Sequence, residues 1–176
     1  FKDPNAATIV DGNLYVADST NDKIRKIVIS TGVVTNFAGS GSGGSTDATG
    51  TAAKFDYPSG ITTDGTNLYV VDHFNHTIRK IVISTGVVTT LAGSAGSTGS
   101  TDATGTVARF KKPRGITIDG TNLYVADGDN HKIRKINTST GVVTTLAGST
   151  SYGSTDATGT SAKFNTPRGI TTDGTN

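Results

Sequence analysis

An internal repeat of 54 or 55 residues constrains this chain more than any other feature. Each copy begins at a phenylalanine and has a proline three residues later, and these four prolines are the only ones in the chain. The starting residues are Phe1, Phe55, Phe110 and Phe164. A repeated unit of this kind buries its apolar faces by stacking on its neighbours. We therefore interpret residues 1–176 as one domain, with units 1–54, 55–109 and 110–163 and the start of a fourth at 164–176.

The third unit shows how each copy divides into four short strands. Residues 115–118, 123–126, 132–136 and 142–147 are rich in Val, Ile, Thr and Tyr, which favour strands. Asp119-Gly120 and Thr140-Gly141 predict tight turns, because glycine tolerates the positive φ that such turns require. A long loop rich in Gly, Ser and Thr follows, and we expect one short helical turn within residues 156–164.

Both faces of each strand are apolar, since Leu123 and Val125 point one way and Tyr124 and Ala126 the other. Such a sheet must be covered on both sides, and face-to-face stacking of repeated four-stranded sheets is the β-propeller solution. A β-solenoid is the alternative, but its coils are usually much shorter. All 14 acidic residues are Asp, and Glu and Met are absent, so good helix formers are scarce. We predict an all-β propeller of four-stranded antiparallel blades, with three blades and one extra strand per chain.

One motif resembles a known repeat family over essentially the whole chain. Residues 113–136 read Pro-x-Gly-Ile-x-x-Asp-Gly-x-x-Leu-Tyr-Val-Ala-Asp-x-x-Asn-x-x-Ile-Arg-Lys-Ile, which resembles the NHL repeat. The loop Gly-Ser-Thr-Asp-Ala-Thr-Gly-Thr-x-Ala-Lys-Phe is similar to an insertion in bacterial and teneurin-like NHL repeats. This resemblance implies a propeller, typically of six blades, that binds proteins, glycans or RNA; a few relatives are lyases. Residues 5–10 depart from the pattern, so the pairing of the first strand stays open.

Composition and charge exclude several classes of site. The chain has no cysteine, which removes disulfides, thiolate metal sites and cysteine nucleophiles. No run of about 18 apolar residues is present, so we expect no membrane span. The formal net charge is +2 with both signs interspersed, which makes a nucleic-acid partner unlikely. The family resemblance implies an extracellular or cell-surface bacterial protein.

Recurring polar residues are interpreted first as structural. Each unit repeats an Asp and an Asn in the loop after its second strand, and an Arg-Lys pair in its third strand. We expect the Asp and Asn to lock the loop. We expect one member of each Arg-Lys pair to pack its stem over a neighbouring strand, with the pair forming an intrablade salt bridge or a solvated edge and not a phosphate contact. The residues are Asp18, Asp72 and Asp127, Asn21, Asn75 and Asn130, and Arg25, Arg79 and Arg134. Their recurrence at one spacing argues against a ring of metal ligands.

The three histidines and the many serines define no catalytic set. His76 and His131 occupy the repeat position at which the first unit has Asp22. Equivalent loops of successive blades lie too far apart to share a metal unless they approach the axis, so we expect surface histidines. Serine and aspartate are too frequent here for a Ser–His–Asp pattern to be specific. We therefore predict no catalytic residues, no metal site and no cofactor.

Differences between the units fall in the loops that a propeller places on one face. We predict that this face binds a ligand, because large aromatic side chains on loops suit interfaces. Neutral drift of loops is the alternative. The candidate binding residues are Tyr57, His73, Phe74, His76, Lys111, Lys112, Arg114, Asp129 and His131. The function expected is a non-enzymatic protein- or glycan-binding module, with a lyase- or lactonase-type enzyme carrying an axial metal, or a purely structural array, as alternatives.

Three blades cannot close a ring, because propellers normally have four to eight. Unclosed blade faces are apolar, which favours association. We therefore expect either a homo-oligomer, most simply a dimer with six blades, or a segment of a longer propeller chain. In such a ring we predict that residues 169–172 of one chain pair with residues 14–17 of another and displace residues 6–10.

Overall fold

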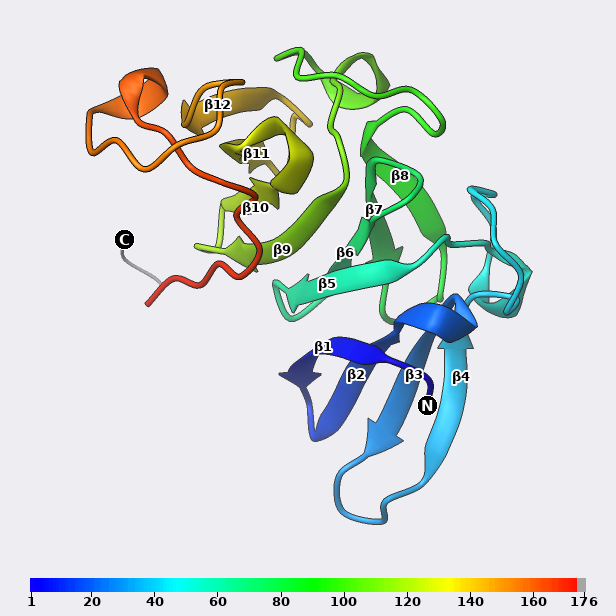
Figure 1. Ribbon diagram of the computed structural model, residues 1–176. Coiled ribbons are helices and arrows are strands. Elements are labelled where there is room, and N and C mark those ends of the chain that lie inside the picture. Colours follow the sequence, from blue (N-terminus) through cyan, green and yellow to red (C-terminus); the bar gives the residue numbers. More distant parts are fainter. Residues whose placement is uncertain (174–176) are drawn as a thin grey trace.

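The computed structural model describes residues 1–173 as three four-stranded antiparallel sheets arranged around one side of an axis (Figure 1). Blade 1 contains β1 (Pro4–Val10), β2 (Asn13–Asp18), β3 (Lys23–Val28) and β4 (Val34–Ala38). Blade 2 contains β5 (Pro58–Thr63), β6 (Asn67–Asp72), β7 (Thr77–Val82) and β8 (Val88–Gly93). Blade 3 contains β9 (Pro113–Ile118), β10 (Asn122–Asp127), β11 (Lys132–Asn137) and β12 (Val143–Ala147). The predicted all-β propeller fold is confirmed.

The helical elements are single 3-10 turns. Two follow the second strand of a blade, η1 (Ser19–Asn21) and η4 (Gly128–Asn130). Three lie in the long loops, η2 (Gly50–Ala52), η3 (Gly105–Val107) and η5 (Gly159–Ser161), where the sequence predicted a short turn. Within residues 1–173 no helix has the length and apolar character needed to cross a membrane.

The first strand of blade 1, whose pairing the sequence left open, pairs regularly with β2. Ala6 lies opposite Ala17 and Val10 opposite Asn13. The missing residue is absorbed by the turn, since Asp11 and Gly12 have φ values of 48° and 70°. Two consecutive positive φ angles are typical of a two-residue type I′ hairpin turn. In the single chain, residues 6–10 therefore hold the innermost position of blade 1. That residues 169–172 of another chain take this position in a ring stays a prediction.

Two apolar cores lie between the blades. Tyr15, Ala17 and Ile24 of blade 1 pack against Leu68 and Val70 of blade 2, and all five side chains are buried. A second core is built in the same way, from Tyr69, Val71 and Ile78 of blade 2 against Leu123 and Val125 of blade 3. The alternating faces of β6 thus contact opposite neighbours, with Leu68 and Val70 toward blade 1 and Tyr69 and Val71 toward blade 3, as the sequence predicted.

The innermost strands approach each other through glycine. A methyl group added at Gly60 would lie 2.5 Å from the carbonyl oxygen of Arg114, and one at Gly115 would lie 2.3 Å from that of Arg168. Residues 164–173 include no assigned strand. The close approach of Gly115 to Arg168 nevertheless places residue 168 next to β9, in the same way that the approach of Gly60 to Arg114 places β9 next to β5. The start of the fourth unit therefore continues the circular arrangement of the innermost strands.

We expect Gly60→Ala to lower the free energy of unfolding by about 1–3 kcal/mol, because the new methyl group overpacks a backbone contact that cannot relax without moving β9. Gly169→Ala is the matched control, because no atom lies within 4 Å of the equivalent methyl position. Urea denaturation of both variants tests this, and equal midpoints would contradict close packing at the axis.

Candidate functional site

A buried carboxylate fixes the loop after the second strand. In blade 2, Asp72 is fully buried and accepts hydrogen bonds from the Asn75 amide at 2.8 Å, the Arg79 guanidinium at 2.8 Å and the backbone N–H of Asp56 at 2.8 Å. The predicted loop lock is therefore confirmed, and of the two alternatives for the Arg-Lys pair the structure shows the intrablade salt bridge, made by the arginine. The sequence did not indicate the contact with Asp56. This contact joins Asp72 to the segment that arrives from blade 1.

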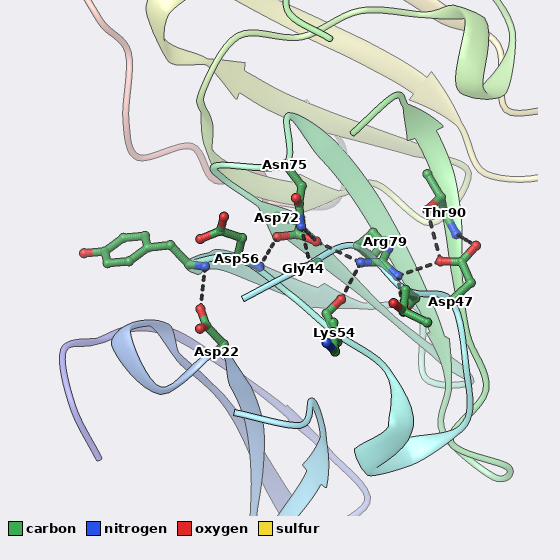
Figure 2. Close-up of polar contacts among 11 residues, drawn as sticks. Asp22, Gly44, Asp47, Lys54, Asp56, Asp72, Asn75, Arg79 and Thr90 are labelled. Carbon is green, nitrogen blue, oxygen red and sulfur yellow. Dashed lines mark hydrogen bonds and ion pairs between the residues drawn. The ribbon is translucent and has the colours of Figure 1, made fainter. Parts of the chain in front are cut away.

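Arg79 also binds the segment that arrives from blade 1 (Figure 2). We call residues 39–57, 94–112 and 148–166 the connecting segments, because each follows the last strand of one blade and leads to the next unit. Arg79 donates to the carbonyl oxygens of Lys54 at 2.9 Å and Thr46 at 3.2 Å and binds the carboxylate of Asp47 at 2.6 Å. The same carboxylate accepts the backbone N–H of Thr90 at 3.0 Å. One side chain thus ties the connecting segment to β7 and, through Asp47, to β8.

Blade 3 repeats this arrangement and blade 1 has only part of it. Arg134 binds Asp127 at 2.9 Å and Asp102 at 2.6 Å, and its side chain is fully buried like that of Arg79. Arg25 binds Asp18 at 3.1 Å, but 24% of its side chain remains exposed. Each guanidinium also lies about 5 Å above a phenylalanine ring, 5.1 Å for Phe55.

Burial and charge oppose each other at these carboxylates. Burial raises the pKa of Asp72 to about 6, against the opposing effect of the Arg79 charge. Burial likewise raises the pKa of Asp127. The hydrogen bonds to each carboxylate offset part of this desolvation. Loss of any one donor would therefore destabilise the buried Asp–Arg pair.

A second set of contacts joins neighbouring blades at the left-handed residue that follows each 3-10 turn or loop. Asp22, His76 and His131 have φ values of 52°, 59° and 57°. Asp22 accepts the backbone N–H of Tyr57 at 2.9 Å, and Nδ1 of His76 accepts that of Lys112 at 3.1 Å. His76 is therefore a half-buried link between blades 2 and 3, and His131 accepts the backbone N–H of Thr166 in the same way at 3.1 Å, so neither is a free surface group. Their alignment with Asp22 was the sequence signal, since all three can accept a hydrogen bond.

The candidate binding face contains an aromatic cluster formed by Tyr57, His73 and Phe74. The ring centroids lie 5.3 Å apart for Tyr57 and Phe74 and 4.7 Å apart for His73 and Phe74. Phe74 is 46% exposed, whereas His73 is 4% exposed. Nδ1 of His73 donates to the carbonyl oxygen of Pro113 at 2.8 Å, and burial lowers the pKa of this imidazole. His73 therefore supports the cluster from beneath and links blade 2 to blade 3.

The remaining predicted residues divide into two groups. Lys112 and Asp129 form an exposed ion pair at 3.7 Å, and the backbone N–H of Asp129 donates to the carbonyl oxygen of Lys111 at 3.1 Å. His131 lies apart from the cluster, against the ring of Tyr152 at 5.9 Å. Comparable backbone bonds in all blades, such as Phe74 N–H to Asp56, show that the variable loops meet on one face.

A groove lies along the innermost strands next to this face. Its volume is about 600 Å³, and Tyr57 and Arg114 line it together with Asn5, Arg168 and a threonine from each innermost strand. Tyr57 also has a short hydrogen bond to Asp3, which raises the pKa of its phenol. Asp3, Asn5 and Arg168 were missed by the sequence reasoning. Arg168 could have been found, because it occupies the same repeat position as Arg114.

Comparison with known proteins places the chain in a family. No family model matches it. It is 34% identical over 144 residues to human NHL repeat-containing protein 2, across 76% of this chain and 20% of the relative. It is 33% identical over 138 residues to Protein SUPPRESSOR OF QUENCHING 1, chloroplastic, of Arabidopsis thaliana, across 72% of this chain and 13% of the relative. The chain belongs to the NHL-repeat family of β-propellers. It spans about a fifth or less of these relatives.

Solved structures agree with this family. A protein of unknown function from Bacteroides thetaiotaomicron superposes with a TM-score of 0.76 at 26% identity, over 96% of this chain and 42% of its own. A virginiamycin B lyase from Staphylococcus aureus superposes with a TM-score of 0.57 at 18% identity, over 83% of this chain and 41% of its own. At that identity the second likeness shows the propeller fold alone.

We expect Arg79→Ala to lower the free energy of unfolding by about 3–5 kcal/mol, because it leaves Asp72 buried without its counter-ion. Arg25→Ala is the matched variant and should cost clearly less, since Arg25 is partly exposed and holds no connecting segment. Chemical denaturation monitored by circular dichroism measures both. Equal losses would show that the contact with the connecting segment contributes little.

We expect acidification from about pH 7 to about pH 5 to remove the stability that the neutral His76 imidazole contributes. Burial lowers the pKa of this histidine below its ordinary 6.5, so the unfolded chain binds the proton more tightly. Stability from the neutral imidazole is therefore present at higher pH and is lost as pH falls below about 6.5. His76→Asn keeps an acceptor and tolerates the left-handed backbone but does not titrate. Its melting temperature should fall less over this range, and an identical fall would contradict the assignment.

Proposed function

We propose that this NHL propeller segment is a non-enzymatic interaction module that binds a protein ligand on its variable-loop face. The observation that carries the proposal is the cluster of Tyr57, His73 and Phe74. Phe74 is a large exposed apolar side chain held by two rings, one of which is buried and bonded to the next blade. A rigid aromatic group loses little conformational entropy on binding, and aromatic residues dominate interface hot spots.

The surroundings of the cluster favour a protein segment as the ligand. Arg114 lies beside Tyr57 at the groove, and the Lys112–Asp129 ion pair lies on the same face. An aromatic centre with a charged rim is the usual anatomy of a protein-binding surface. A glycan ligand remains the alternative, because NHL-type propellers bind both classes. An extracellular or bacterial cell-surface location belongs to the same proposal.

The enzyme alternative finds less support in the residues that the structure describes. Among residues 1–173 no group of three or more His, Cys, Asp or Glu side chains lies close enough to hold a metal ion. An Asp–Arg pair recurs in every blade, fully buried in blades 2 and 3, and these arginines also bond to backbone carbonyl oxygens, which is typical of a structural role. We therefore place the function in the aromatic face, where the units differ from one another.

We expect the immobilised chain to select peptides from a random-peptide display library, and Phe74→Ala to weaken each selected peptide at least about tenfold. The variant should fold normally, because Phe74 is 46% exposed. Tyr152→Ala is the matched control, since Tyr152 is a 71% exposed aromatic residue outside the cluster. It should retain binding.

A glycan array run in parallel separates the two ligand classes. Binding to glycans without any peptide selection would contradict a protein ligand. Peptides that bind the Phe74→Ala variant as tightly as the original chain would contradict the aromatic face.

A further inference from the structure

The groove along the innermost strands contains an arginine without a counter-ion. Arg114 lines this groove, and among residues 1–173 its side chain forms no hydrogen bond or ion pair, although its Nε is buried. The Nε atoms of Arg79 and Arg134 are also buried without a partner, but the terminal nitrogens of these two side chains each bind two carboxylates. A guanidinium carries five N–H donors and no acceptor, so Arg114 has donors available for a ligand.

The loop after the second strand of blade 3 makes room for this guanidinium. At the same loop position blade 1 has Ser19 and blade 2 has His73, and both side chains donate to a proline carbonyl oxygen of the next unit, at 2.5 Å and 2.8 Å. Blade 3 has Gly128 instead. A methyl group added there would lie 3.1 Å from Nε of Arg114 and 2.9 Å from the carbonyl oxygen of Lys112. Arg114 therefore occupies space next to a loop position that carries a side chain in the other two blades.

The neighbours that this position has in the other blades are all present around Arg114. In blade 1 the equivalent residue, Asn5, donates to Ser19 of its own blade at 3.0 Å and to Tyr57 of the next unit at 3.3 Å. In blade 2 the equivalent residue, Ser59, donates to a backbone carbonyl oxygen of the next unit at 3.0 Å. The matching positions around Arg114 are 128, 166 and 168, and the structure describes all three. None of them is acidic, so the repeat itself provides no carboxylate for Arg114.

The guanidinium of Arg114 lies near the aromatic cluster. Burial lowers the pKa of the His73 imidazole, and the charge of Arg114 lowers it further. The hydrogen bond to Asp3 raises the pKa of the Tyr57 phenol, and the charge of Arg114 opposes this effect. Tyr57 joins the two parts of the face, because it lines the groove and its ring centroid lies 5.3 Å from that of Phe74. A ligand that packs on Phe74 can therefore extend to Arg114.

The groove itself suits an anionic group. Its volume is about 600 Å³, and among the described residues that line it none is acidic, whereas Arg114 and Arg168 are both basic. Asp3 is the acidic residue next to Tyr57, and its carboxylate accepts the phenol proton. The innermost strands of a propeller surround a central channel, so additional blades would enclose this groove and not fill it.

We propose that Arg114 binds a carboxylate in this groove, and that the protein ligand whose apolar part packs on Phe74 supplies it. The inference rests on the proposed function for the nature of the ligand. The carboxylate belongs to an Asp or Glu side chain or to a free C-terminus, because all of these present the same planar group. A guanidinium matches this group with two parallel N–H···O bonds. Phe74 then provides affinity, and Arg114 selects acidic over neutral segments.

An NMR titration with glutarate, a small dicarboxylate, tests the carboxylate site without any protein ligand. The Nε–H signal of Arg114 should be visible because this group is buried, and Arg114→Asn identifies the signal by its loss. Blade 1 has Asn at the equivalent position, so the variant should fold. We expect the signal to shift and to saturate with a dissociation constant of about 1–10 mM.

Two controls accompany this titration. The Nε–H signal of Arg109 should stay in place, because its guanidinium is held by three backbone carbonyl oxygens and lies outside the groove. Sodium chloride at the same ionic strength should leave the Arg114 signal in place. An Arg114 signal that does not move with glutarate, or that moves equally with sodium chloride, overturns the proposal.

The peptides selected on the aromatic face provide a second test. We expect each to contain an Asp, a Glu or a required free C-terminus, and conversion of that group to its amide to weaken binding by about tenfold. Amides made separately at the side chain and at the C-terminus distinguish the two sources of the carboxylate.

Variants of Arg114 show whether this residue reads the carboxylate. Arg114→Asn should weaken the acidic peptide by the same factor and leave its amide analogue unchanged, which is the coupling that a direct contact requires. Arg114→Lys should keep part of the affinity, because an ammonium retains the charge without the two-bond geometry. Arg109→Asn is the matched control for the lost charge and should bind both peptides normally. Equal losses for the acidic peptide and its amide with Arg114→Asn would contradict the contact.

The outcomes separate this inference from the proposed function. Selected peptides that depend on Phe74 but need no acidic group would overturn the role of Arg114 and leave the proposed function standing. If no peptide is selected, the proposed function fails, and the glutarate titration alone decides whether Arg114 binds a carboxylate.

Discussion

A guanidinium buried between a carboxylate and a connecting segment is the interaction on which the rest of this structure depends. Arg79 and Arg134 each bind an Asp of their own blade and an Asp of the arriving segment, and both side chains are fully buried. A buried charge is tolerated only when several partners surround it. These contacts therefore fix the course of the connecting segment, and the segment in turn positions the first strand of the blade that it enters.

These contacts also position the residues that form the variable-loop face. The backbone of Asp56 is bonded to Asp72, and the next residue is Tyr57, whose left-handed backbone is held by Asp22 of the preceding blade. Tyr57 is thereby placed against Phe74. A surface built on two locked segments can hold an exposed aromatic group in one orientation, which is what an interface anchor requires.

The same contacts distinguish blades 2 and 3 from blade 1. Between blades, every Asp–Arg–Asp set is complete and every phenylalanine ring is buried, as for Phe55 and Phe110. Within residues 1–173, Arg25 of blade 1 forms an ion pair with Asp18 alone, and 24% of its side chain is exposed.

The sequence by itself determined the repeat, the four strands of each blade and the stacking, because alternating apolar residues and Asp-Gly turns act locally. It also indicated that the recurring Asp, Asn and Arg residues are structural. Only the tertiary structure showed that Arg79 reaches Asp47, 32 residues earlier, and that His76 and Asp22 play the same part. It also placed His73 beneath Phe74 and not on the surface. These contacts join segments of different blades, and no local pattern specifies which backbone group a side chain will meet.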